Sequence, residues 1–117
     1  MRRIRLVLAT ATLVLLAVAP AQAALPRLVG TVGPGFTITL KKSATKVTKL
    51  KAGKYSITVS DRSSSHNFHL TGPGVNKKTS VGGTGLTQWM VTLQKGKIYR
   101  FVCDPHAAIM KGSLKTF

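Results

Sequence analysis

Acidic residues are almost missing from this 117-residue chain, which has 18 lysines and arginines but only two aspartates and no glutamate. Asp61 and Asp104 belong to no Ser-His-Asp arrangement, and the sequence contains neither a P-loop nor a dinucleotide-binding fingerprint. Hydrolases and most acid–base enzymes depend on such positioned groups. We therefore expect a protein that is not an enzyme.

Long apolar runs are also missing, with one exception near the N-terminus. A basic start, Met1–Arg5, precedes the largely apolar run Leu6–Ala19, and Ala21–Ala23 places small residues where a signal peptidase reads. The apolar run is shorter than the roughly 20 residues that a membrane-spanning helix needs. We expect residues 1–23 to be a secretory signal peptide, with an uncleaved anchor as the alternative, and the mature protein to be periplasmic or extracellular.

Cleavage after Ala23 would leave one domain, residues 24–117, and would lower the formal net charge from +16 to +13 by removing three arginines. Such a charge favours acidic partners or anionic surfaces. Nucleic acid is not expected as a partner, because arginine-rich tracts are missing and aromatics are few. We expect a monomer that docks to an acidic partner protein; peripheral contact with an anionic membrane surface and a merely solvated basic surface are the alternatives.

Period-two alternation of apolar and polar residues predicts β-strands through the mature region. We expect strands at 36–40, 55–59, 66–70, 89–93 and 99–103, and a closing strand at 113–117. Gly- and Pro-rich turns separate these strands, and Gly72–Gly85 is predicted to be a long loop, with a short irregular strand inside it as the alternative. In segment 66–70 the two histidines should point to opposite faces, with His69 toward the surface. This pattern indicates an all-β sandwich or barrel.

Potential metal ligands gather near the C-terminus. Cys103, His106 and Met110 lie within eight residues, and His66 begins an upstream strand. Two imidazoles, a thiolate and a weak thioether suit a copper ion that cycles between Cu(I) and Cu(II). Zinc is the rival metal, since a His₂Cys set can bind it with a water as fourth ligand. Copper is favoured because no carboxylate is placed as a general base for zinc hydrolysis.

The only cysteine of the chain lies inside this group, so no internal disulfide can form. A lone cysteine in an exported protein pairs with another chain, stays free and reactive, or binds something. The neighbouring residues of Cys103 favour the third outcome.

The C-terminal motif resembles a known family. Cys-Asp-Pro-His followed by Met-Lys-Gly, the preceding Tyr-x-Phe-x-Cys and the upstream His66-Asn67 pair are similar to the ligand segments of the plastocyanin, pseudoazurin and amicyanin group of type 1 blue copper proteins, the cupredoxins. The resemblance covers about residues 30–117. It implies a Greek-key antiparallel β-sandwich of about seven or eight strands and one copper ion. The implied ligands are His66, Cys103 and His106, with Met110 as the axial ligand.

Three residues separate His106 from Met110, whereas plastocyanin-like loops carry four there and amicyanin-like loops carry two. The resemblance also implies that Asn67 ties the two ligand segments together by hydrogen bonds. Pro105 has no N–H and so cannot donate to the thiolate. We expect Asp104 to be a structural or surface residue.

By this resemblance the protein shuttles single electrons between redox partners. The edge of His106 would be the exit for the electron, ringed by Ala107, Ala108, Ile109 and Pro73. A copper-binding or delivery protein without electron transfer is the alternative. It is disfavoured because the mature chain has only two methionines and no Met- or His-rich tract. A structural or interaction module that keeps the copper site as a stabiliser is a third interpretation.

Overall fold

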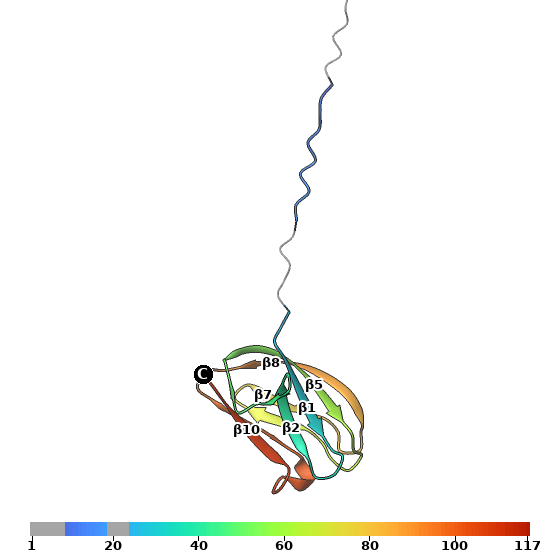
Figure 1. The fold of residues 1–117 in the computed structure, drawn as a ribbon, viewed down its shortest axis with the longest axis vertical. Helices are drawn as coiled ribbons and strands as arrows, with labels where there is room; N and C mark the ends of the chain where they lie inside the picture. Colours follow the sequence, from blue (N-terminus) through green and yellow to red (C-terminus); the bar gives the residue numbers. More distant parts are fainter. Residues whose placement is uncertain (1–8, 19–23) are drawn as a thin grey trace, which may run out of the picture.

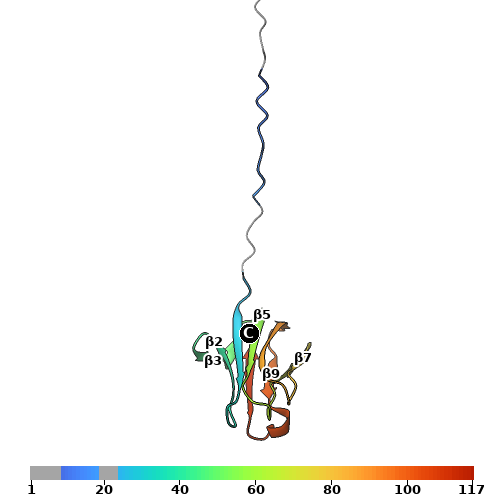
Figure 2. The same ribbon diagram turned by 90° about the vertical axis from the view of Figure 1, so that its right-hand side faces the viewer.

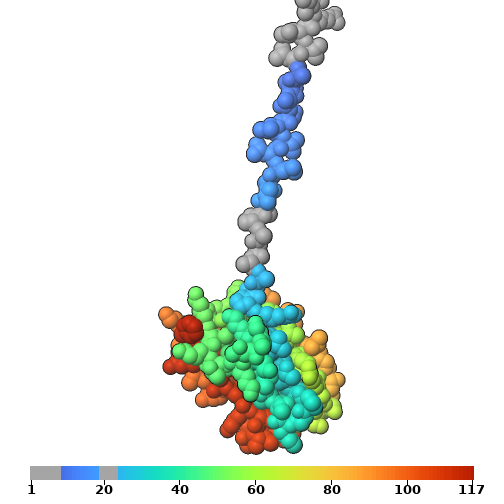
Figure 3. Space-filling model, in the orientation of Figure 1, coloured from blue at the N-terminus to red at the C-terminus, as the bar shows by residue number. Residues whose placement is uncertain are grey.

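The computed structural model describes residues 9–18 and 24–117 of the chain. Residues 9–18 form no helix or strand, and they extend away from the folded domain (Figure 1) with their side chains exposed (Figure 3). The rest of the predicted signal peptide, residues 1–8 and 19–23, lies outside the described residues. Within the described ranges, no helix is long and apolar enough to cross a membrane.

Residues 24–117 form a domain of short strands joined by turns. The elements in chain order are β1 Arg27–Val32, β2 Ile38–Lys42, β3 Thr45–Lys46, β4 Lys49–Leu50, β5 Gly53–Asp61, β6 His69–Gly72, β7 Val75–Lys78, β8 Gly85–Leu93, β9 Ile98–Val102, the 3₁₀ helix η1 Asp104–His106, and β10 Lys111–Thr116.

The strands form two layers (Figure 2), a sheet of order β3-β2-β1-β5-β8 and a sheet of order β4-β10-β9-β6-β7. The predicted all-β sandwich is confirmed, and eight of its described strands are longer than two residues. Most strand pairs are antiparallel as expected, but both sheets are mixed, because β1 pairs with β5 and β10 with β4 in parallel. Each of these pairs joins strands that are separated by intervening elements, and a parallel pairing requires such a crossover.

Apolar side chains from both sheets meet in the core. The alternation predicted at 55–59, 89–93 and 99–103 is confirmed, since every second residue there is buried. Phe68 and Phe101 stack at the centre, with ring centroids 5.6 Å apart and an interplanar angle of 4°. Burying a side chain of this size stabilises the fold by about 1.5–3 kcal/mol.

The predicted strand at 66–70 begins later than expected. β6 starts at His69, and His66, Asn67 and Phe68 are all buried, so the expected alternation of faces fails there. The departure is at Asn67, whose side chain is buried because it bonds to Asp104 and to the Thr79 carbonyl. The backbone N–H of Phe68 donates to the Thr79 hydroxyl at 2.9 Å, while the Phe68 ring fills the core. The predicted 72–85 loop contains the short strand β7, which agrees with the alternative given for this segment.

The segments that carry the predicted ligands gather at one end of the sandwich. The end of β9, η1 and the start of β10 lie there, opposite the end at which the N-terminal segment enters the domain (Figure 1). The β1–β2 turn reaches the same end and carries Phe36, which precedes β2 rather than beginning it as predicted.

Candidate metal centre

Three of the four predicted ligands converge on one point. His66 lies in the segment before β6, Cys103 directly follows β9, and His106 ends η1. The two Nδ1 atoms are 3.0 Å apart, and Cys103 Sγ is 3.7 Å from Nδ1 of His66 and 3.6 Å from Nδ1 of His106. Within the described residues, these three side chains form the group of His, Cys, Asp or Glu residues that could hold a metal ion.

The spacing of the donors fits a single ion. Imidazole nitrogen and thiolate sulfur lie about 2.0–2.3 Å from a bound zinc ion, and copper has similar ligand distances. A trigonal arrangement at that radius separates the donors by about 3.5 Å, by plane geometry from those bond lengths. Separations of 3.0, 3.6 and 3.7 Å are close to this value. A trigonal His₂Cys set with a weak axial ligand is characteristic of blue copper sites.

Burial differs among the three donors. Cys103 is 0 % exposed and His66 is buried, whereas His106 is half-buried. An ion held here would therefore be shielded from water on the Cys103 side. On the other side, the half-buried His106 ring would lie between the ion and the molecular surface.

The loop from Cys103 to Met110 is held by its own backbone. The amide of Cys103 donates to the Met110 carbonyl at 3.0 Å, and the amide of Met110 donates to the His106 carbonyl at 2.8 Å. A further bond runs from the His106 amide to the Cys103 carbonyl at 3.0 Å. Met110 is buried at this end, so a loop with three residues between His106 and Met110 closes without an open gap. Its thioether as axial ligand stays a prediction.

Asn67 ties the two ligand segments together, as the family resemblance implied. Its side-chain oxygen accepts from the backbone N–H of Asp104 at 2.7 Å, and its side-chain nitrogen donates to Asp104 Oδ2 at 2.7 Å. Its backbone N–H points at Cys103 Sγ from 3.4 Å. Such outer partners hold ligands in their binding orientation.

His69 and Asp104 take part in the same network, which the sequence did not reveal. Nδ1 of His69 lies 2.7 Å from Asp104 Oδ1, and Nε2 lies 2.7 Å from Asn76 Oδ1. Burial acts to raise the pKa of Asp104, but hydrogen bonds from His69 and Asn67 and the nearby charges of His69 and Lys78 outweigh it and lower that pKa. The expectation that His69 is simply a surface residue is wrong, because only 19 % of its side chain is exposed.

Phe36 is a second residue that the sequence did not assign to the site. Its ring centroid lies 5.5 Å from that of His66 and 5.0 Å from that of His106, and the ring itself is 62 % exposed. The only sequence feature that could have indicated this placement of Phe36 was its position just after the turn at Gly33-Pro34-Gly35. Pro73, by contrast, does not ring His106: its carbonyl accepts from the Tyr99 hydroxyl near the start of β9, whereas the ligands follow the end of that strand.

Comparison with known proteins decides the family. A family model described as copper binding proteins of the plastocyanin/azurin family matches residues 36–116. The chain belongs to the plastocyanin/azurin family of copper-binding proteins. This cupredoxin shares its metal, copper, with the family, and the group of His66, Cys103 and His106 is able to hold one ion.

Solved structures agree on the fold. Reduced rusticyanin matches with 21 % identity and a TM-score of 0.56, over 78 % of this chain and 78 % of that chain. Rusticyanin from Thiobacillus ferrooxidans matches with 21 % identity and a TM-score of 0.54, over 78 % and 76 %. A heme-copper terminal oxidase dimer matches with 19 % identity and a TM-score of 0.55, over 78 % and 63 %. A comparison with curated protein sequences finds no match.

Proposed function

We propose that this cupredoxin is a type 1 copper protein that carries single electrons, with His66, Cys103 and His106 as the strong ligands and Met110 as the weak axial ligand. The observation that carries this proposal is the convergence of two imidazole nitrogens and one buried thiol at trigonal spacing. Copper, when bound, would supply the one-electron Cu(I)/Cu(II) couple.

The protein contributes to electron transfer by holding the proposed ligand atoms in fixed positions. Cu(I) and Cu(II) prefer different geometries, and a site that cannot relax toward either loses little energy in reorganisation on electron transfer. The backbone bonds from Cys103 to Met110 and the Asn67 tie restrain the ligands from both sides. They hold the thiol and the rings in nearly their binding positions without an ion.

Electrons would pass through the edge of His106. This ring is the half-buried member of the group, and exposed apolar residues surround it: Phe36, Ala107, Ala108 and Ile109. A small apolar patch permits brief, dry contact with a partner protein. Single exposed apolar residues are normal on a protein surface, but a contiguous apolar patch beside the proposed redox site indicates an interaction surface.

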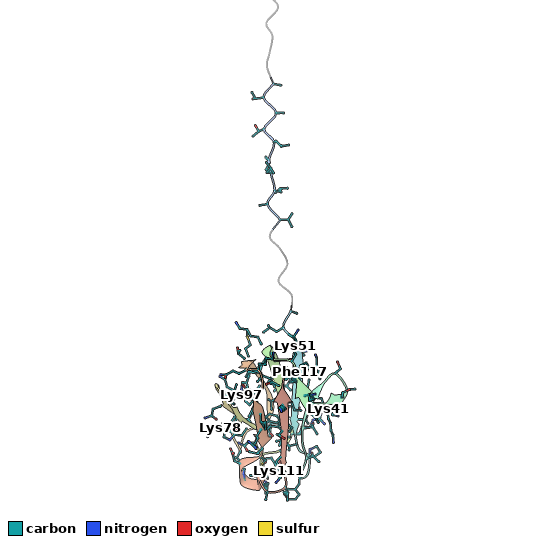
Figure 4. All side chains as sticks on the ribbon, turned by 90° about the vertical axis from the view of Figure 1, so that its left-hand side faces the viewer. Lys41, Lys51, Lys78, Lys97, Lys111 and Phe117 are labelled. Carbon is teal, nitrogen blue, oxygen red and sulfur yellow. The ribbon has the colours of Figure 1, made fainter. Side chains whose placement is uncertain are left out.

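The charge of the molecule supports an acidic partner. Strand register places five exposed cations on the outer face of the second sheet, three of them on central strands and two nearer its edges: Lys111, Lys115, Arg100, Lys49 and Lys78. Figure 4 shows lysines along the length of the domain. They extend from Lys51 and Lys97, toward the end at which the N-terminal segment enters, to Lys111 at the end that carries the proposed ligands. Such a field steers an acidic redox protein into encounter. An anionic membrane surface is the alternative, no nucleic-acid partner is proposed, and the protein is proposed to act as a monomer.

Residues 1–23 are proposed to be a signal peptide, which would leave residues 24–117 as the exported domain. Support comes from the apolar side chains of residues 13–16 and 18, which are 74–91 % exposed and pack on nothing (Figure 3). A protein that kept this segment in water would bear an unfavourable apolar surface.

Redox cycling of the purified copper-loaded protein tests the function. The reduced protein is mixed with one equivalent of ferricyanide, re-reduced with ascorbate, and followed through repeated cycles by its visible absorbance. We expect full and rapid recovery in each cycle. A protein that binds Cu(I) but never forms a stable oxidised state would support the alternative, copper delivery without electron transfer.

A matched pair of variants tests whether electrons leave the site through the edge of His106. Electron self-exchange between oxidised and reduced copies, measured by NMR line broadening, should slow in Ile109→Ser, because Ile109 is 65 % exposed beside His106. Ile98→Ser is the control, since Ile98 is also exposed but lies at the start of β9, at the other end of the sandwich. Equal rates for both variants would contradict the assigned exit.

A further inference from the structure

The side chains of His69 and Asp104 join two ligand-bearing segments outside the metal centre itself. His69 is the first residue of β6 and lies opposite Val102 in the β6–β9 pairing. Asp104 is two residues beyond Val102 and begins η1, between Cys103 and His106. The strand register therefore brings His69 beside the start of the ligand loop, and Nδ1 of His69 meets Asp104 Oδ1 at 2.7 Å.

Each oxygen of the Asp104 carboxylate has its own partner. Oδ1 faces His69, and Oδ2 accepts from the side-chain nitrogen of Asn67 at 2.7 Å. The same Asn67 side chain accepts the backbone N–H of Asp104, and its own backbone N–H is aimed at Cys103 Sγ. A chain of contacts thus runs from His69 through Asp104 and Asn67 to the thiol.

A carboxylate with a single partner can rotate about its χ2 bond, whereas one that is held at both oxygens cannot rotate without losing a bond. Hydrogen bonds that involve a charged group are the stronger ones in proteins. His69 is well suited to the second bond, because its ring is largely buried and its Nε2 is anchored on Asn76 Oδ1 at 2.7 Å. A ring with a hydrogen on both nitrogens donates to both of these oxygens.

We propose that His69 is a positioning residue for the metal centre, which holds the Asp104 carboxylate in the orientation that locks Asn67 and closes the ligand loop over Cys103. This role rests on the proposed function only in that Cys103 is taken as a ligand. It predicts a property of the metal-free protein: without His69, the loop from Cys103 to Met110 opens more often.

Reactivity of the thiol measures that opening directly. Cys103 is the only cysteine of the chain and is 0 % exposed, so iodoacetamide reaches it only when the loop opens. The informative pair is His69→Leu and His69→Asn, because the side chains of leucine and asparagine have nearly the same shape. Asparagine can place an amide nitrogen where the imidazole has Nδ1, whereas leucine places a methyl group there.

We expect metal-free His69→Leu to be alkylated about tenfold faster than the wild type, which corresponds to the loss of one hydrogen bond to a charged group. His69→Asn should stay within about twofold of the wild type, since it keeps a donor to Asp104. Urea unfolding of the same variants is the control for a general loss of stability, and the difference in alkylation should exceed any difference that global unfolding explains.

Equal alkylation of the wild type and His69→Leu would overturn the proposal. So would a His69→Asn variant as reactive as His69→Leu, because the donor to Asp104 would then be irrelevant. Failure of the proposed function has a different signature: the alkylation pattern would hold, but the wild type would take up no copper.

Copper-loaded samples add a readout that general stability does not move. The thiolate-to-copper absorption band reports on the surroundings of Cys103 Sγ, and we expect its position to shift in His69→Leu and to stay in place in His69→Asn. An unshifted band in both variants would contradict a positioning effect that reaches the thiol.

Discussion

The two segments of this cupredoxin that carry the proposed ligands are held in different ways. The downstream loop, residues 103–110, is restrained by backbone bonds between its own residues. The upstream segment, residues 63–68, has two bonds of its own, from His66 N–H to the Ser63 carbonyl at 3.4 Å and from Ser65 N–H to Ser63 Oγ at 3.2 Å. It relies in addition on side chains outside it: Ser63 N–H donates to Asp61 Oδ1 at 3.1 Å, and Phe68 N–H donates to Thr79 Oγ1 at 2.9 Å. One segment is a locally defined turn, and the other is an irregular stretch held by a distant threonine and a buried aspartate.

This contrast teaches where mutations should matter. Conservative changes in the downstream loop at positions that carry neither a proposed ligand nor a bond to Asn67 or His69, such as Ile109, should be tolerated as long as the backbone bonds remain. Changes to the supports of the upstream segment should be costly even though these supports are not ligands.

The largest effect is expected from Phe68→Ala, which removes the anchor of the upstream segment. Phe68 is fully buried and stacks on Phe101. Loss of a buried phenylalanine should lower the free energy of unfolding by about 3–5 kcal/mol, measured by urea denaturation. The matched change in the downstream loop, Ile109→Ala, removes a mostly exposed side chain and should cost no more than about 0.5 kcal/mol. Similar losses in both variants would remove the contrast.

Gly112→Ala should give the next largest loss. Gly112 pairs with Phe101 across β10 and β9, and an added Cβ would overlap the Phe101 ring. Overpacking of this kind costs about 1–3 kcal/mol, which thermal or urea unfolding would show. Gly96→Ala is an unsuitable control, because Gly96 has a positive φ. Gly82→Ala is the better one, since a Cβ there meets nothing, and a loss as large as that of Gly112→Ala would refute the overlap as the cause.

Thr79→Val tests the support of the upstream segment. The hydroxyl of Thr79 accepts from Phe68 N–H and donates to Asp61 Oδ2 at 3.4 Å, and valine has the same shape without these bonds. A buried amide left unpaired costs about 1–3 kcal/mol. Urea unfolding should show this loss, and a chelator should remove copper from the site at a higher rate. Thr79→Ser keeps the hydroxyl and should behave like the wild type; a serine variant as weak as the valine variant would disprove the role of the hydroxyl.

The smallest effects concern charge at the surface, which acts on encounter rates and not on either segment. The proposed mature domain, residues 24–117, has a formal net charge of +13, so two copies repel each other and self-exchange should accelerate as salt rises. Oxidation by ferricyanide, an anion, should slow over the same range, on the order of severalfold to tenfold. If both rates moved in the same direction with salt, electrostatic steering would be ruled out.

The contrast also explains what the sequence could predict. The closeness of Cys103, His106 and Met110 at one end of the sandwich was predictable because they lie within eight residues, and bonds inside such a short loop follow from local spacing. Their roles as copper ligands stay a prediction. The alternating strands were predictable for the same reason, since side chains in a strand alternate between faces.

The upstream segment was less predictable because its structure depends on contacts between distant residues. The contact of His69 with Asp104 could not be predicted from the sequence without the β6–β9 register, whereas the tie through Asn67 followed from the family resemblance. The burial of Asn67 between His66 and Phe68 breaks the expected alternation. Phe36 reaches the site through the β1–β2 turn, whose direction is set by the packing of the two sheets. The parallel pairings of β1 with β5 and β10 with β4 also arise only when the sheets are assembled.

One measurement tests the central claim, that His66, Cys103 and His106 form a single copper site. The purified wild type and Cys103→Ser are each titrated with Cu(II), and the visible spectra are recorded. We predict an intense blue colour in the wild type that saturates at about one equivalent, from thiolate-to-copper charge transfer in a His₂Cys site, and none in Cys103→Ser. A colourless wild type, or a colour that persists in the serine variant, would contradict the account.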